Sequence, residues 1–288
     1  EFYMLLILLR IYLSGLTFSW FCFQRGEERF SVLLGALLYA FCFWTIFAAV
    51  RHPYFMNPMI YFPLVLSGVD RIFEKKRPFL YIVSLAAAIL ANFYFGYMIC
   101  ILVFLYCIFR YRALSGAFAW KRLAGWAGRF LMYTIPALLL ASVLLVPVAL
   151  YALSGGRLAG ERWIPMFYSS SYYKSFFPAF LSGEAGSWSE FGYTAYGLLG
   201  VLLLFLQRKK NTMLKAGFLF VTVMLWLPAA GYVMNGFSYA MNRFSWAYAM
   251  LVAYIFVHTW QDLVTLTRRQ KKRLLLAGFV CIAVCMGL

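Results

Sequence analysis

An apolar run from about Phe79 to Phe109 is interrupted by the polar and aromatic stretch Asn92 to Tyr97, and this interruption constrains the fold more than any other feature of the sequence. About 20 helical residues cross the hydrocarbon core of a membrane, so the run is too long for one ordinary span. Two interpretations fit: one long tilted helix with an unusual centre, or two half-length helices that meet at a turn inside the membrane.

The composition places the chain among all-α polytopic membrane proteins. Of its 288 residues, 65% are hydrophobic and 12% are charged, whereas a soluble domain carries about 25% charged residues. The cysteines all lie in apolar runs without metal-ligand spacing, so we interpret them as buried thiols. They are Cys22, Cys42, Cys100, Cys107, Cys281 and Cys285.

The remaining apolar runs predict further spans within a single transmembrane domain over residues 1–288. Since the chain begins in one apolar run and stops within another, we expect it to be an internal fragment of a longer protein. Prolines in the third run predict a kinked helix or a half-span. The expected apolar segments are Phe2 to Phe23, Phe30 to Val50, Tyr54 to Val69, Phe130 to Leu153, Phe191 to Leu206, Ala216 to Met234, Phe244 to Trp260 and a last run from Leu274.

Basic residues predict the orientation of these spans. The chain has 26 Lys and Arg against 9 Asp and Glu, a net charge of +17, and nearly all the basic residues lie in short connections. Such loops face the cytoplasm, where anionic membrane lipids are the expected partners rather than nucleic acid. The basic connections follow Phe23, Val69, Phe109, Leu206 and Trp260, and include a charged loop from Asp70 to Arg77 and an amphipathic interfacial segment from Arg110 to Arg129.

If both flanks of the interrupted run are cytoplasmic, the run enters the membrane and returns, which makes Asn92 to Tyr97 the turn of a re-entrant helix pair. Limbs of about 13 residues span roughly 20 Å, so the turn is expected below the outer surface, lining a cavity that opens outward. The other outer connections are Arg51 to Pro58, an outer loop at residues 154–190, and Asn235 to Arg243.

Two arginines on this side are the most informative candidates. Arg10 lies inside the first span and Arg243 at the head of another. An arginine in the membrane is costly unless it is paired or hydrated, and its planar fork suits the oxygens of a lipid-linked phosphate. The structural alternatives are that Arg10 snorkels to the interface or pairs with a carboxylate, and that Arg243 anchors the start of a helix.

Aromatic and amide side chains complete the predicted substrate-binding set. Asn92, Tyr94 and Tyr97 suit stacking on and hydrogen bonding to a sugar, although aromatic residues also populate membrane interfaces without a chemical role. His52 beside Pro53 is equally explained as an interface histidine. The candidates are Arg10, Arg51, His52, Asn92, Tyr94, Tyr97, Asn235, Asn242 and Arg243.

No catalytic acid or base stands out. The outer carboxylates are Glu161, Glu184 and Glu190, and Glu190 is most simply a partner for the dipole of the helix that follows it. The sequence contains no Gly-rich phosphate loop, zinc motif or nucleophile elbow. No cofactor is evident, and outer acidic residues leave a divalent metal open.

Several motifs resemble those of the YfhO family of bacterial membrane proteins over most of the chain. They are Asn92-Phe93-Tyr94-Phe95-Gly96-Tyr97, Ser14-Gly15-Leu16-Thr17-Phe18 after Arg10, Tyr196-Gly197, and Asn235-Gly236-Phe237-Ser238-Tyr239 with Asn242-Arg243-Phe244. That family resembles the GT-C class of polytopic glycosyltransferases, which implies a GT-C-like transmembrane helical bundle.

The resemblance implies transfer of a sugar from a polyprenyl-phosphate donor to a cell-envelope polymer, such as lipoteichoic acid of Gram-positive bacteria, on the outer side of the cell membrane. It also implies an essential acidic residue in the first outer loop, upstream of Glu1, so these residues are expected to be inactive alone. The alternatives are a flippase or transporter of lipid-linked sugars, which lacks support from any internal repeat or buried acidic residue, and a non-catalytic envelope assembly factor.

Overall fold

The computed structural model describes residues 2–116, 119–153, 164–207 and 210–287, and helices are the regular secondary structure of this part of the chain. Helices hold 81% of the residues and no strand forms there. The prediction of an all-α protein is therefore confirmed. In order, the elements are α1 (Phe2–Gln24), α2 (Arg29–Ala40), α3 (Phe43–Arg51), η1 (Pro53–Met56), α4 (Asn57–Phe73), α5 (Phe79–Ala91), α6 (Phe93–Ser115), α7 (Trp120–Leu140), α8 (Ser142–Leu153), α9 (Ser170–Ser182), α10 (Thr194–Leu206), α11 (Thr212–Trp226), α12 (Pro228–Met234), α13 (Ser245–Val264) and α14 (Arg268–Gly287).

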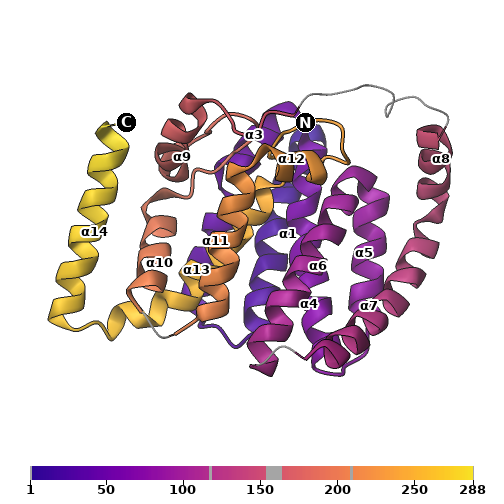
Figure 1. Cartoon of the computed structure of the whole chain (residues 1–288), viewed down its shortest axis with the longest axis horizontal. Coiled ribbons are helices and arrows are strands. Elements are labelled where there is room, and N and C mark those ends of the chain that lie inside the picture. Colours follow the sequence, from indigo (N-terminus) through magenta and orange to yellow (C-terminus); the bar gives the residue numbers. More distant parts are fainter. Residues whose placement is uncertain (1, 117–118, 154–163, 208–209, 288) are drawn as a thin grey trace.

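The long helices stand side by side, with α14 at one edge of the row and α7 and α8 at the opposite edge (Figure 1). The connections that follow α1, α4, α6, α10 and α13 lie at one end of the row, which we call the basic end. At the opposite end lie α3, α9 and α12.

Three helices within the described residues, α1, α6 and α7, are long and apolar enough to cross a membrane. Two bent pairs raise that number to five if each pair is one span: α2 with α3, bent by 40°, and α11 with α12, bent by 94°. Pro228 accounts for the sharper bend, because it lacks an N–H and forces Leu227 into an extended conformation. These helices agree with a polytopic membrane protein.

The break at Asn92 is a helix boundary of one residue. Asn92 has extended backbone angles, and its Oδ1 accepts a hydrogen bond from the N–H of Tyr94 at 3.0 Å, which caps α6. The adjoining helices pack against each other, and a Cβ on Gly96 would lie 2.9 Å from the Cα of Ile89. Only glycine permits this approach, so a tight helix pair is present.

The predicted equal limbs are wrong. The turn is Asn92 alone, while the stretch up to Tyr97 forms the first turn of α6. That helix has 23 residues and α5 has 13, so only α5 is too short to cross the hydrocarbon core alone. The N-cap explains the difference, because a capping side chain lets a helix begin at the next residue without a loop.

The two charged segments are also more helical than predicted. Asp70 belongs to α4, which ends at Phe73, and Arg110 belongs to α6, which ends at Ser115. Ion pairs between these side chains inside the bundle explain why the polar residues extend the helices. The predicted interfacial segment contributes the start of α7, where Trp126 packs 4.8 Å from the ring of Phe73.

The predicted outer loop at 154–190 is only partly a loop. Residues 154–163, including Glu161, lie outside the described part of the chain, and the remainder contains α9 and an isolated bridge between Glu184 and Glu190.

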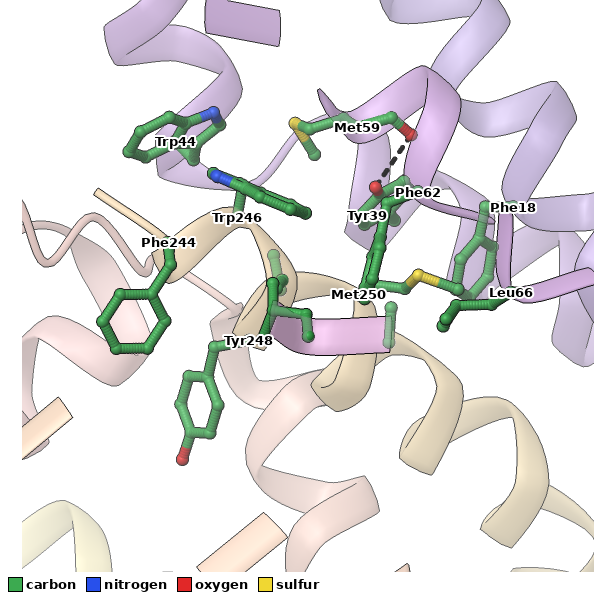
Figure 2. Packing of buried hydrophobic residues seen from close by; sticks show 14 of the residues in the cluster. Phe18, Tyr39, Trp44, Met59, Phe62, Leu66, Phe244, Trp246, Tyr248 and Met250 are labelled. Carbon is green, nitrogen blue, oxygen red and sulfur yellow. Dashed lines mark hydrogen bonds between the residues drawn. The ribbon is translucent and has the colours of Figure 1, made fainter. Parts of the chain in front are cut away.

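The core surrounds α13. Trp246 is fully buried and meets the ring of Phe62 edge-on at 5.2 Å, while Tyr39 donates a hydrogen bond to the carbonyl of Met59 at 2.8 Å (Figure 2). A Cβ on Gly200 would lie 2.6 Å from the Cα of Phe256. Small residues thus bring neighbouring helices close, as in other membrane bundles.

Candidate functional site

Four aromatic rings surround the guanidinium of Arg243 at the end opposite the basic end. We call this group the Arg243 cage. The guanidinium carbon lies 4.2 Å from the ring centre of Trp188, 5.0 Å from Tyr239, and 5.9 Å from both Phe55 and Tyr94. The rings come from η1, α6, the connection between α9 and α10, and the connection before α13. Their negative faces stabilise a cation.

The donors of Arg243 are not fully used. Its Nη1 donates to the hydroxyl of Tyr239 at 2.8 Å, whereas its Nε is buried without an acceptor. No carboxylate in the described residues forms an ion pair with it. A partly buried cation with an unpaired donor is costly, so this arrangement suits an anionic ligand.

Asn235 positions one wall of the cage. Its Oδ1 accepts a hydrogen bond from the hydroxyl of Tyr94, and its Nδ2 donates to the carbonyls of Gly231 and Met241, both at 2.5 Å. Tyr239 in turn donates to the hydroxyl of Tyr94 at 3.3 Å. Because its side-chain amide is hydrogen-bonded within the protein, we assign Asn235 the role of positioning Tyr94.

Asn242 is a structural residue in this arrangement. It is fully buried, and its Nδ2 donates to the carbonyl of Leu225 at 2.9 Å, the hydroxyl of Tyr172 at 2.9 Å and Oγ of Ser189 at 3.0 Å. Its Oδ1 accepts from the hydroxyl of Tyr168 at 3.2 Å. These bonds join the connection before α13 to α9 and α11.

Three other predicted residues contact the protein outside the cage. Arg10 donates from Nε to Oδ1 of Asn57 at 3.1 Å, which joins α1 to α4. Tyr97 donates to the carbonyl of Val233 at 3.0 Å, and Asn92 caps α6. Of the predicted set, Arg243, Tyr94 and Asn235 form the cage and its hydrogen-bonded support.

Arg51 and His52 are exposed beside it. The guanidinium carbon of Arg51 lies 4.6 Å from the ring centre of Phe47, whose ring meets Trp188 at 5.1 Å. The ring of His52 lies 5.0 Å from that of Phe55. Both candidates thus border the cage through aromatic rings that belong to it or touch it.

Glu190 is a buried carboxyl close to this site. Burial, reinforced by the negative charge of Glu184 and opposed by Arg51, raises the pKa of Glu190 from its ordinary value near 4.5 to about 8. Its Oε2 has no partner, and its backbone N–H donates to Oγ of Ser245 at 3.3 Å. The predicted role at a helix start is wrong, because α10 begins at Thr194.

Three cage residues, Phe55, Trp188 and Tyr239, were not among the predicted site residues. Tyr239 ends the motif Asn235-Gly236-Phe237-Ser238-Tyr239 and lies four residues before Arg243, which is a usable signal. Trp188 lies in a glycine- and serine-rich connection, and nothing in its local sequence indicates a contact with Arg243.

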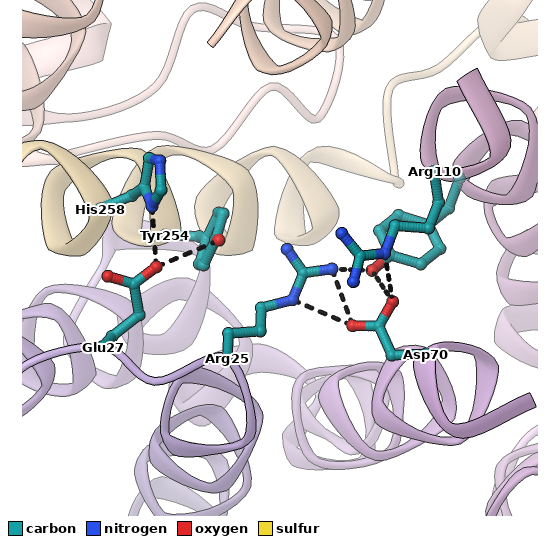
Figure 3. A network of polar contacts seen from close by, with 7 residues as sticks. Arg25, Glu27, Asp70, Arg110, Tyr254 and His258 are labelled. Atoms are coloured by element: carbon teal, nitrogen blue, oxygen red, sulfur yellow. Dashed lines mark hydrogen bonds and ion pairs between the residues drawn. The ribbon is translucent and has the colours of Figure 1, made fainter. Parts of the chain in front are cut away.

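A second polar group, which we call the basic-end network, lies at the basic end (Figure 3). Asp70 accepts from Nη2 of Arg25 at 2.7 Å and from Nε of Arg110 at 2.9 Å. Glu27 lies 2.8 Å from Nδ1 of His258. These contacts join the ends of α1, α4, α6 and α13.

A cavity of about 660 Å³ also lies at this end, between α6, α11 and α13. Its lining contains no residue from Asn92 to Tyr97, which were predicted to line an outward cavity. Within the described residues, no three His, Cys, Asp or Glu side chains come together as a metal site.

Comparisons with known proteins identify a family. The sequence model of the family described as "Bacterial membrane protein YfhO" matches residues 1–288. The chain is also similar to the "Uncharacterized protein YfhO" of Bacillus subtilis (strain 168), with 28% identity over 85 residues, which are 30% of this chain and 10% of that protein. No solved structure matches.

Proposed function

The chain belongs to the YfhO family of bacterial membrane proteins, and we propose that it forms part of a membrane glycosyltransferase. The enzyme transfers a sugar from a polyprenyl-phosphate donor to a cell-envelope polymer, such as lipoteichoic acid, on the outer side of the membrane. The observation that carries this proposal is the buried, unpaired Nε of Arg243 inside a cage of aromatic rings.

The cage combines the two kinds of group that a sugar phosphate requires. A guanidinium donates several hydrogen bonds to phosphate oxygens in one plane. Aromatic faces such as those of Trp188 and Tyr239 offer apolar surface against which a sugar ring can pack, with hydroxyl groups at the edges. Because Arg10 donates to Asn57, we assign the phosphate to Arg243 alone.

The proposed step displaces phosphate from the sugar. The hydroxyl oxygen of the acceptor forms a bond with the anomeric carbon, and the bond from that carbon to the phosphate oxygen breaks. The electron pair leaves with polyprenyl phosphate, whose developing charge Arg243 stabilises. The hydroxyl proton passes to a carboxylate, which we place upstream of Glu1.

We infer which side of the membrane the cage faces from the basic residues in the connections between helices. The Arg243 cage lies at the end opposite the basic connections, and basic connections face the cytoplasm. We therefore place the cage on the outer side, where lipid-linked donors and envelope polymers are both accessible.

A transporter of lipid-linked sugars is the second candidate. The helix pairs α2 with α3 and α11 with α12 are each interrupted by a break, with bends of 40° and 94°. Broken helices line the binding sites of many transporters.

Proteoliposomes that contain the whole protein separate these functions. With a radiolabelled polyprenyl-phosphate sugar and an envelope polymer, a glycosyltransferase consumes the donor and labels the polymer. A transporter moves intact donor between leaflets without labelling the polymer. Protein-free liposomes provide the control, and donor that stays intact and unmoved would favour a non-catalytic assembly factor.

A further inference from the structure

We propose that the cavity at the basic end binds a phosphate-bearing lipid, with its phosphate beside Arg110 and Arg112 and a hydrocarbon chain between α6, α11 and α13. This site lies at the opposite end of the bundle from the Arg243 cage, and it does not depend on the glycosyltransferase proposal.

The lining of the cavity is polar at one end and apolar along its depth. On α6, Tyr106 and Arg110 lie toward the basic end and Leu102 lies deeper. On α13, His258 lies at the basic end and Ala247 at the far end of the lining. At 1.5 Å per residue, the lined part of α13 spans about 16 Å. The polar end of the cavity therefore suits a lipid headgroup, and its apolar length suits a hydrocarbon chain.

The side formed by α11 repeats this order. Asn211 and Thr212 lie at the basic end, and Gly217 and Val221 lie farther along the helix. A Cβ on Gly217 would meet no atom within 4 Å. The absent side chain at Gly217 thus leaves open space beside apolar residues, where a hydrocarbon chain fits.

The charge at the polar end favours an anion. Arg25, Arg110 and Arg112 line the cavity, and Asp70 is the carboxylate that pairs with the first two. Arg110 uses only Nε for Asp70, and its terminal nitrogens meet no acceptor in the part of the chain that the structure describes. The nearby carboxylate of Glu27 is engaged by His258. The excess of positive charge suits phosphate.

A lipid explains both halves of the cavity, whereas a soluble phosphate uses only the polar end. The cavity volume of about 660 Å³ lies within the ordinary range for ligand sites. One wall, α6, is long and apolar enough to cross a membrane, which agrees with a ligand drawn from the membrane.

Binding of three probes to the whole protein in detergent micelles tests the proposal. The probes are dioctanoyl phosphatidylglycerol, glycerol phosphate, which lacks the chains, and dioctanoylglycerol, which lacks the phosphate. We expect the complete lipid to bind at least about 10-fold more tightly than either part, a difference of about 1.4 kcal/mol. Equal binding of glycerol phosphate would identify a soluble-anion site and overturn the proposal.

Two variants place the lipid in this cavity. Arg110→Gln removes the phosphate donor while Arg25 still pairs with Asp70, and Gly217→Phe fills the apolar part; each is expected to weaken binding about 10-fold or more. The matched control is Gly125→Phe on α7. Gly125 does not line the cavity, and a Cβ there also meets no atom within 4 Å.

Thermal unfolding of each variant distinguishes lost lipid binding from lost folding. Gly217→Leu provides a smaller substitution that fills the same space if Gly217→Phe does not fold. Unchanged lipid binding in folded Arg110→Gln and in a folded Gly217 variant would contradict the proposed site.

Discussion

The guanidinium carbon of Arg243 lies 4.2 Å from the ring centre of Trp188, although Trp188 belongs to the connection between α9 and α10 and Arg243 precedes α13. Hydrogen bonds fix these two segments together. Ser245 donates from Oγ to the carbonyl of Trp188 at 3.2 Å and accepts from the N–H of Glu190 at 3.3 Å. The cage therefore depends on a connection that is anchored to the start of a core helix.

Cysteine labelling tests the orientation of the cage. Phe237 is 54% exposed at the end that holds the cage, and Lys76 is exposed at the basic end. In intact cells, a membrane-impermeant thiol reagent should label Phe237→Cys and not Lys76→Cys, and permeabilisation should allow both. The natural cysteines in the described chain are buried or half-buried, and the unsubstituted protein measures their background. The reverse labelling pattern would place the cage in the cytoplasm.

Asn242→Ala is expected to reduce stability rather than substrate binding alone. The substitution removes the donor that the carbonyl of Leu225 and the hydroxyls of Tyr172 and Ser189 share, and it removes the acceptor of the Tyr168 hydroxyl. Each lost hydrogen bond contributes about 0.5 to 1.5 kcal/mol, so the apparent unfolding temperature should fall clearly. Ser19→Ala, which loses one hydrogen bond to the carbonyl of Gly15, is the control. Unchanged unfolding of Asn242→Ala with lost sugar binding would restore the ligand role predicted for this residue.

Asp70→Asn should destabilise the bundle strongly, because Asp70 compensates both Arg25 and Arg110. Removing one partner from a buried ionic group costs about 3 to 5 kcal/mol. The exposed pair of Glu74 with Lys76 has a similar distance of 2.7 Å, and Glu74→Gln should change stability by less than about 1 kcal/mol. Thermal unfolding in detergent compares the two. Equal effects would show that Asp70 contributes no more than a surface pair.

Glu190 predicts a pH dependence of stability. Its pKa of about 8 in the folded protein exceeds its ordinary value near 4.5, so between these values the folded state holds a proton that the unfolded state has released. Stability should therefore fall as pH rises from about 5 through 8. Unfolding temperatures of Glu190→Gln should fall less over this range than those of the unsubstituted protein. Parallel pH profiles would mean that Glu190 is not held protonated by burial.

Apolar runs and basic connections were sufficient to predict the helices that lie in those runs and the helix pair at Asn92, but not α9, which lies in the predicted outer loop. The exact length of each limb depended on the hydrogen bond between Asn92 and Tyr94, which continues α6 without a loop. Likewise, the sequence predicts Asp70 as a loop residue, because its ion pairs with Arg25 and Arg110 form only in the folded protein. Local sequence patterns do not contain such long-range pairs.

The candidate site was predictable only in part, because most of its contacts join residues that are far apart in the sequence. Arg243 stood out because a charge at the head of a span is costly, and Tyr94 because it belongs to an unusual motif. The role of Asn242 depends on three acceptors from distant segments, and the contact of Trp188 depends on the fold of its connection. Neither follows from spacing along the chain.

Sugar transfer by Arg243 variants of the whole protein tests the central claim most directly. Membranes that carry the unsubstituted protein, Arg243→Lys or Arg243→Ala receive a radiolabelled polyprenyl-phosphate sugar, and label in the envelope polymer is measured at equal protein content. We predict loss of transfer in Arg243→Ala by about 100-fold or more and partial transfer in Arg243→Lys, because lysine keeps the charge without the planar fork. Normal transfer by folded Arg243→Ala would contradict the assignment of the phosphate to the cage.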